Sequence, residues 1–389
     1  MMPVVRSCLL FSICFFIFAC GSSSTTSTSS TTTSTASAWD VVTSSGTVID
    51  GTDFIGTDQS GLIATGGVTQ GSSSGDFDIA IVDSDTTNGW AVGSLGEVLK
   101  STDSGTTSTR LDFSTLSASR LRAVAPVTTT HVWIGGQDSV NLGASIWVTT
   151  TGGTSWSSQF NTVTAFPNRS LTTLDRVNSL FFFDENTGYA AGGYSGNVSF
   201  ILKTTNSGST WTTVYDTQTT GTNDEINRIF FADTSNGYAV GNRAAILETT
   251  DGGTTWTNIS STFTCPNSDP DSCDLHEVSC SDVNTCYIGG EGGLIAKTTD
   301  AAATWTVLTT GTTEDISALD VRSEKIWAGG FNGTILYSEN SGTTWTAQTS
   351  NTTYIVQKIE MVSDLVGYAA CGNTATNTGA ILKTTTGGK

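Results

Sequence analysis

Basic side chains recur at one place in a repeated pattern of this chain. They stand ten to thirteen positions before an aromatic residue that opens a short Gly-rich phrase, and they are Arg120, Arg122, Arg176, Arg228, His276 and Lys358. Cationic groups gathered on one face could bind the anionic groups of a partner. The alternative is that they are scattered charges that keep the chain soluble. The pattern alone leaves both interpretations open.

Residues suited to acid–base catalysis are present but poorly arranged. Adjacent carboxylates occur at Asp224-Glu225 and Glu314-Asp315, but catalysis by a carboxylate pair needs the two groups at a set distance across a site. We interpret these residues as solvated loop charges, and His131 and His276 as structural. The glycines do not form a phosphate-binding loop between a strand and a helix. We therefore expect no catalytic residue and no cofactor.

Four of the eight cysteines lie close together, at Cys265, Cys273, Cys280 and Cys286. Cys280 and Cys286 flank a turn between two expected strands and can pair, as can Cys265 and Cys273 within one loop. The rival interpretation is a metal site, but the spacing lacks the C-x-x-C pattern usual for zinc. We expect two disulfides and no metal, with Cys371 left over.

One stretch of eight residues, Thr249–Trp256, recurs along the chain and must position these groups. We call it the octet and expect a tight turn between two strands. Its acidic or amide residue can accept hydrogen bonds from turn N–H groups, and its Gly supplies a positive φ. Its Trp can be buried at the start of the next strand. The structural residues expected from the copies are Asp103, Asn206, Asp251, Asp300, Asn340, Trp156, Trp211, Trp256, Trp305 and Trp345.

A second phrase, such as Tyr238-Ala239-Val240-Gly241, precedes each octet at intervals of 40 to 56 residues. Within one unit we expect strands at Ile226–Phe231, Tyr238–Gly241, Ala245–Thr249 and Trp256–Ile259. A period of this length with four short strands predicts the blades of a β-propeller. Lysines that recur just before the octets are expected at the surface, namely Lys100, Lys203, Lys297 and Lys383.

The octet resembles the Asp-box, or bacterial neuraminidase repeat, and the whole unit is similar to that of the photosystem II assembly and stability factor family. The resemblance covers about Trp39 to Lys389 and implies an all-β, seven-bladed propeller with four-stranded antiparallel blades. It also implies an arginine-rich patch for protein partners. Since the repeat occurs in many unrelated proteins, it does not specify a function.

The repeat is shared with sialidases, and a xyloglucanase-like hydrolase resembles two such propellers clamped together. A sialidase needs three arginines that converge on a carboxylate, and Arg176 and Arg228 supply two. This chain has one propeller. A glycan-cleaving hydrolase is therefore the alternative interpretation, behind a non-enzymatic one.

The two ends of the propeller region complete each other. Trp39–Thr43 matches the strand that follows an octet, whereas Thr384–Lys389 is an octet cut off before its Trp. We expect the first strand to close the last blade and so remove two exposed sheet edges. The segment Gly46–Gly75 does not fit the repeat and is an insertion or a decayed blade; we favour the insertion.

The chain begins with features of an exported lipoprotein. Residues 1–19 have a basic start and a short apolar run, and the segment ends at Cys20 in a lipobox-like sequence,. The alternative is ordinary secretory cleavage or a short anchor. Residues 22–38 are almost all Ser and Thr, and are expected to be a flexible tether. Because Gly21 is not Asp, the usual sorting rule predicts the outer membrane or cell surface.

The net charge limits the choice of partners. The 389 residues carry 16 basic and 35 acidic side chains, a formal charge of −19. This argues against nucleic acid and against direct binding to an anionic membrane surface. We expect a monomer that contacts the membrane only through a lipid anchor and binds a protein or glycan partner at one rim, in an assembly or adhesion role.

Overall fold

The computed structural model describes residues 39–41, 77–82, 85–93, 96–102, 109–111, 118–138, 143–161, 176–194, 198–217, 225–266, 269, 272–373 and 378–388. The chain divides into two compact units, Met1–Ala36 and Ser37–Lys389, and every described residue belongs to the second. The predictions for the signal peptide, Cys20, the tether, Asp103 and Gly46–Gly75 concern residues outside these ranges.

The described strands form seven antiparallel sheets of four strands each. The first three sheets are β2 (Phe77–Val82), β3 (Asp85–Gly93), β4 (Glu97–Ser101) and β5 (Thr109–Arg110); β6 (Ala118–Pro126), β7 (Val132–Asp138), β8 (Ala144–Thr149) and β9 (Ser157–Asn161); and β10 (Arg176–Phe182), β11 (Gly188–Tyr194), β12 (Val198–Thr204) and β13 (Thr212–Asp216).

The next three sheets follow the same order. They are β14 (Ile226–Phe231), β15 (Gly237–Gly241), β16 (Ala245–Thr249) and β17 (Thr257–Asn258); β18 (Leu275–Cys280), β19 (Cys286–Gly290), β20 (Ile295–Thr298) and β21 (Thr306–Val307); and β22 (Ile316–Arg322), β23 (Lys325–Gly330), β24 (Ile335–Ser338) and β25 (Thr346–Ala347). The last sheet has β26 (Ile355–Met361), β27 (Gly367–Asn373), β28 (Thr378–Thr384) and β1 (Asp40–Val41). Short 3-10 turns occur at η1 (Ser260–Thr262), η3 (Glu291–Gly293) and η4 (Phe331–Gly333).

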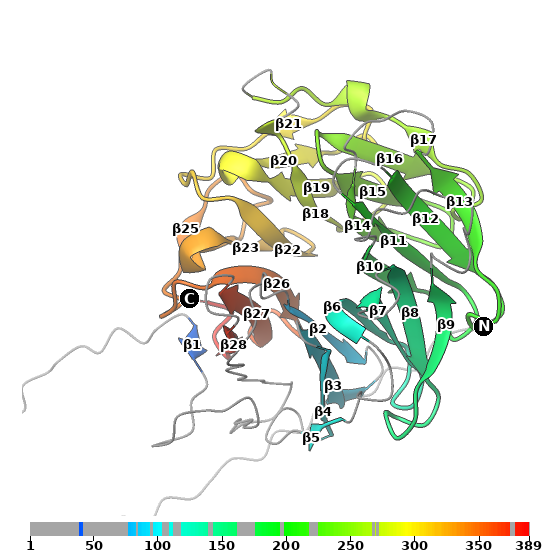
Figure 1. Ribbon diagram of the computed structural model, residues 1–389. Coiled ribbons are helices and arrows are strands. Elements are labelled where there is room, and N and C mark those ends of the chain that lie inside the picture. The colour runs from blue at the N-terminus through cyan, green and yellow to red at the C-terminus, as the bar shows by residue number, and fades with distance from the viewer. Residues whose placement is uncertain are drawn as a thin grey trace, which may run out of the picture. The chain divides into compact units, whose positions relative to one another are not determined.

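The sheets are the blades of a propeller. The first strand of each blade contacts the first strands of the blades before and after it, and the series β2, β6, β10, β14, β18, β22, β26 returns to β2. Figure 1 shows these inner strands around a common centre. The predicted seven-bladed all-β fold is confirmed.

The Gly-rich phrases exist because the blades pack face to face at short range. A Cβ atom at Gly329 would lie 2.4 Å from Val356 Cγ1 of the next blade, and one at Gly135 would lie 2.5 Å from Val177 Cγ1. A side chain at either position would force the blades apart. Glycine therefore sets the spacing between blades here, besides shaping turns.

The ring closes between the two ends of the unit, as the sequence predicts. In β1, Asp40 pairs with Lys383 and Val41 with Leu382 of β28. Trp39 is fully buried, and its indole N–H donates to Gln348 Oε1. Trp39 thus supplies the octet Trp that the C-terminal fragment lacks.

The described octets make their turn in the same way. In Thr249–Trp256, the Thr249 hydroxyl accepts from Gly253 N at 2.8 Å, while Asp251 Oδ1 accepts from Thr254 N and Thr255 N at 2.9 Å. These bonds stabilise the ionised carboxylate and lower the pKa of Asp251 to about 2,. The fourth and fifth residues, Gly252 and Gly253, both have a positive φ of 67°.

The peptide group of the fourth octet residue connects two blades. Its N–H bonds to the turn between the first two strands of its own blade, as in Gly252 N to Ser235 O at 2.9 Å. Its carbonyl accepts from the preceding blade, as in Gly252 O from Tyr189 OH and Lys203 Nζ, both at 2.6 Å. We call this arrangement the seam bond.

The seam bond recurs around the ring, and it explains the recurring lysines. Lys100 Nζ donates to Gly152 O at 2.8 Å and Lys297 Nζ to Ser341 O at 3.5 Å. Each of these ammonium groups also lies over the aromatic ring of its own blade. The expectation that these lysines are simple surface positions is therefore wrong: Lys383 is only 8% exposed.

Removing the seam lysine should loosen the ring. Lys203→Met keeps the side-chain length but loses a charged hydrogen bond and a cation–π contact, and we expect the free energy of unfolding to fall by about 1 kcal/mol. Denaturant unfolding measures this. Glu248 occupies the same position in the next blade, so Glu248→Lys is the reciprocal variant and should gain stability. Equal stability of the wild type and Lys203→Met would contradict a contribution of the seam bond.

Ring closure should depend on Trp39. Truncating a fully buried Trp removes its packing and leaves a cavity, so Trp39→Ala should cost about 3–5 kcal/mol. Trp345→Ala is the matched control, because that ring holds the same octet position but is only half-buried. Thermal unfolding should show the larger loss for Trp39→Ala, and the reverse order would contradict closure through β1.

Candidate functional site

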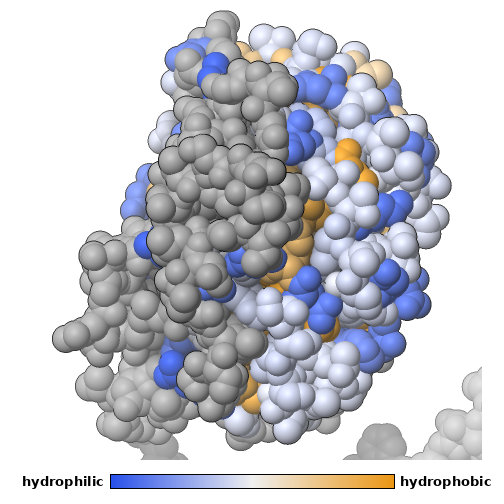
Figure 2. All heavy atoms as spheres, turned by 45° about the vertical axis from the view of Figure 1, so that its right-hand side comes forward, coloured by the Kyte–Doolittle hydropathy of each residue, from blue (hydrophilic) through white to orange (hydrophobic). Residues whose placement is uncertain are grey.

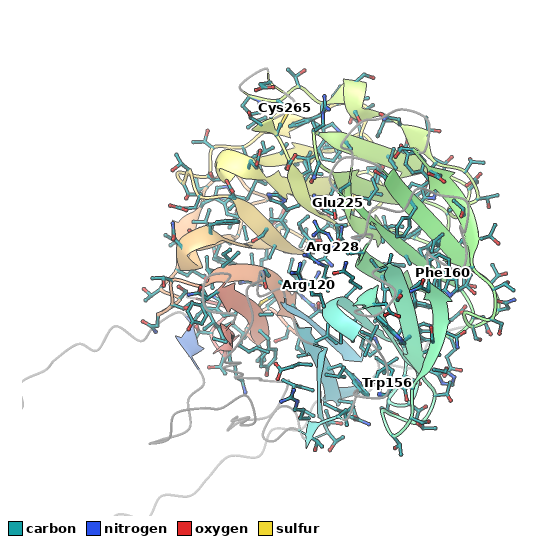
Figure 3. The ribbon with its side chains drawn as sticks, viewed as in Figure 1. Arg120, Trp156, Phe160, Glu225, Arg228 and Cys265 are labelled. Carbon is teal, nitrogen blue, oxygen red and sulfur yellow. A yellow bond between two sulfur atoms is a disulfide. The ribbon has the colours of Figure 1, made fainter. Side chains whose placement is uncertain are left out.

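All six basic residues named from the sequence lie on inner strands. Arg120 and Arg122 are on β6, Arg176 begins β10, Arg228 is on β14, His276 on β18 and Lys358 on β26. Figure 3 shows Arg120 and Arg228 directed toward the centre of the ring. The N-terminal ends of the inner strands share one face with the connections between blades, and we call it the entry face.

A β-bulge at the same register shapes six of the inner strands. The extra residue is polar in each, and these residues are Arg122, Asn178, Asn227, His276, Ser317 and Gln357. Where the bonds are described, this side chain donates to the next inner strand: Asn178 to Ile226 O, Asn227 to Leu275 O and Ser317 to Val356 O, at 2.7–2.9 Å. The bulge thus links neighbouring blades as well as turning side chains toward the centre.

The arginines of the inner strands bind buried glutamates. Arg176 holds Glu225 through two bonds, Nε to Oε1 at 2.6 Å and Nη2 to Oε2 at 2.9 Å. Arg228 Nη2 lies 2.8 Å from Glu277 Oε2, and Lys358 Nζ lies 3.7 Å from the same oxygen. The side chains of both glutamates are only 2% exposed.

The predicted basic patch is therefore largely neutralised by its own partners. Of the four arginines, Arg120 differs: within the described ranges its half-buried side chain has no ion pair and no hydrogen bond. The interpretation of Asp224-Glu225 as solvated loop charges is wrong for Glu225, which is a buried partner of Arg176. Asp224 lies outside the described residues.

Two titratable groups near this network have shifted pKa values. Burial raises the pKa of Asp320, on β22, to about 6, although the Met361 N–H donates to its Oδ2 at 2.9 Å. Burial lowers the pKa of His276, against the attraction of Asp274, Asp315, Glu291 and Glu277. His276 is therefore neutral near pH 7 and is part of the packing.

The remaining candidates have structural contacts. Glu314 Oε2 accepts from Asn332 Nδ2 at 2.8 Å, and Asp315 Oδ1 accepts from Gly292 N at 2.8 Å. His131 Nδ1 lies 3.1 Å from Glu185 Oε1. Cys265 bonds to Cys273 and Cys280 to Cys286, the pairs expected from the sequence, and Cys371 is buried and unpaired.

The entry face carries a pocket of about 530 Å³ on the blade formed by β18 to β21. It lies among η3, the segment after β21 and the loop that Cys265–Cys273 closes. That loop is one of the connections between blades. Across the part of the chain that is described, no group of His, Cys, Asp and Glu could hold a metal ion, and no helix is long and apolar enough to cross a bilayer.

The glutamates that pair with the inner-strand arginines were not predicted, although the repeat contains a charge pattern that indicates such pairs. Arg176 and Glu225 stand 49 residues apart, at equivalent places in neighbouring blades. The residues at that place are Arg120, Arg176, Glu225, Asp274 and Asp315 in five successive blades. The sign of the charge changes between the third and fourth blades, so opposite charges meet where these blades adjoin.

The fold and the octets define the class: a β-propeller built of bacterial neuraminidase repeats. The chain resembles the photosystem II assembly factor, since the family model described as "Photosynthesis system II assembly factor YCF48" matches residues 210–373. No protein with a curated function matches the chain.

Solved structures share the fold at low identity. The structure "YCF48 bound to D1 peptide" is 18% identical with a TM-score of 0.59, and the match covers 84% of this chain and 99% of that one. YCF48 from Cyanidioschyzon merolae is also 18% identical with a TM-score of 0.59, covering 82% and 97%. The GH74 enzyme of Niastella koreensis is 17% identical with a TM-score of 0.54, but the match covers only 52% of that chain.

Ionisation of Asp320 should destabilise the fold. Its pKa is about 6 in the folded protein against 3.8 ordinarily, so the folded state binds the proton more tightly and stability falls as pH rises through this range. Asp320→Asn should remove this loss, which amounts to up to about 3 kcal/mol. Denaturant unfolding from pH 4 to 8 should show that the free energy of unfolding of the variant, relative to that of the wild type, rises with pH up to about pH 7. Parallel curves would contradict the raised pKa.

Proposed function

We propose that this protein is a non-enzymatic propeller that binds a protein partner on its entry face. The similarity to YCF48 over nearly the whole of that chain carries the proposal, because the YCF48 structure is described as bound to a peptide. The entry face suits such a role, since it combines the pocket beside η3 with Arg120, whose side chain has no partner among the described residues. Binding residues in many folds lie on such connections, held by a rigid scaffold.

The chemistry of the inner strands favours binding over hydrolysis. A carboxylate that acts on a substrate must be free to contact it, whereas a carboxylate paired with an arginine of the scaffold is already engaged. Glu225 and Glu277 are both held in this way. They act as structural counter-ions, which agrees with the interpretation of the protein as non-enzymatic.

We also propose that the protein is exported and lipid-anchored through Cys20, at the outer membrane or cell surface. The support is the apolar segment in residues 1–19, the lipobox-like ending at Cys20 and the Ser/Thr-rich stretch 22–38. The two disulfides agree with an oxidising compartment,. The tether would let a monomeric propeller reach its partner at some distance from the lipid.

Capture of a partner from the native membrane tests the proposed function. The full-length protein, tagged at its C-terminus, is cross-linked in its own membranes, and the captured proteins are identified by mass spectrometry. Arg120→Glu reverses a charge that has no partner in the described structure, so the fold should survive while capture of a specific protein falls severalfold. Glu324→Lys is the matched control, because it reverses an exposed charge on the opposite face.

Two outcomes would overturn the proposal. One is that Arg120→Glu loses no more capture of the partner than the control Glu324→Lys does. The other is release of reducing ends from a panel of polysaccharides by the wild type but not by Asp320→Asn, because that would favour the glycan-cleaving alternative.

A further inference from the structure

The pocket on the entry face has walls from three segments. These are η3, the segment 307–313 that leads from β21 to β22, and the loop bounded by Cys265 and Cys273. Its volume of about 530 Å³ is within the range of ligand sites,. The inner-strand ion pairs described above contribute no lining residue, so this pocket is a separate feature of the face.

Local contacts hold these walls in place. The Thr310 hydroxyl donates to Gly293 O at 2.9 Å, and a Cβ at Gly293 would lie only 2.1 Å from Thr312 O. The disulfide Cys265–Cys273 ties the third wall, and both cysteines are buried. A pocket held open in this way does not have to be ordered by its ligand, which favours binding.

The lining is partly apolar and lacks positive charge. Leu294, Val307 and Leu308 contribute aliphatic surface, and Val307 is 43% exposed. Threonines and glycines supply most of the rest, and no Lys or Arg is among the described residues of the lining. Figure 2 shows that the described surface in that view is mostly hydrophilic or intermediate, with smaller hydrophobic patches. Exposed aliphatic side chains gathered in a pocket can mark a contact site for a partner.

Carboxylates surround the pocket. Glu291 lines it directly, and its Oε2 accepts from Asp274 N at 3.1 Å. Asp315 bonds to the lining residue Gly292, Asp269 bonds to the lining residue Ser272, and Glu314 follows the lining segment. The same part of the inner ring has Glu225, Asp274 and Asp315 where earlier blades have arginines.

We propose that this pocket binds a cationic segment of a protein partner, with an aliphatic side chain seated against Leu294, Val307 and Leu308 and a Lys or Arg directed at Glu291 and Asp315. This inference rests on the proposed function and specifies the chemistry of the partner. The carboxylates around the pocket speed association with a cationic segment and disfavour an acidic one. Leu294, Val307 and Leu308 supply the apolar contact area.

A random dodecapeptide phage library, selected on the full-length protein, tests the inference. Enriched peptides should have a net positive charge next to an aliphatic residue. When such peptides are synthesised with a fluorescent label, anisotropy should show at least threefold weaker binding to Glu291→Gln and to Val307→Ser. The control Glu324→Gln should bind as the wild type does, because that exposed carboxylate lies on the opposite face.

The experiments distinguish a failure of this pocket assignment from a failure of the proposed function. Neutral or acidic enriched peptides, no enrichment, or equal weakening by Glu291→Gln and Glu324→Gln would overturn the inference, the last because it indicates attraction to the overall charge. Circular dichroism of each variant confirms folding. If cross-linking in native membranes captures the same partner with Glu291→Gln and Val307→Ser, the proposed function stands and the assignment of this pocket fails.

Discussion

The backbone peptide group at the fourth position of the octet connects the blades. Its N–H is bonded within its own blade, and its carbonyl is bonded to an aromatic hydroxyl, an indole N–H or a lysine of the blade before. Both bonds need a chain that reverses tightly with two residues at positive φ, and glycine meets this need without strain. The octet is therefore a connector between blades as much as a turn. A Thr or Ser at its first position is buried because it caps that turn from inside.

At the inner edge of the blades, the bulged inner strands also connect neighbouring blades. Their extra polar residue bonds to the next strand, and their charged residues pair across blades. A buried glutamate without its arginine would leave an uncompensated charge, so each pair fixes the distance between two blades. Arginines that look like a binding surface in sequence are thus mostly part of the scaffold. What the entry face offers to a partner is the remainder: Arg120 and the pocket.

How much the sequence could predict follows from the range of each interaction. The octet turn, the strands Ile226–Phe231 and Ala245–Thr249 and the pairing of Cys280 with Cys286 are local, and they were predicted within a residue or so. The closure through Trp39 was predicted because two incomplete repeats match. The Glu225–Arg176 pair and the seam lysines were missed, because each partner lies one repeat away. Only an alignment of the blades against one another brings these residues together.

The blade that carries the pocket departs from the others in three related ways. Glu248 replaces the lysine at its seam with the preceding blade, and burial raises the pKa of this carboxyl. Its octet has Ala301 and Ala302 at positive φ, where glycine is favoured,. Both disulfides fall in or beside this blade. Cys280–Cys286 joins β18 to β19 within the blade, and Cys265–Cys273 closes the loop before β18. The second disulfide therefore constrains one wall of the pocket and preorganises a binding surface, on the blade whose seam lacks the lysine.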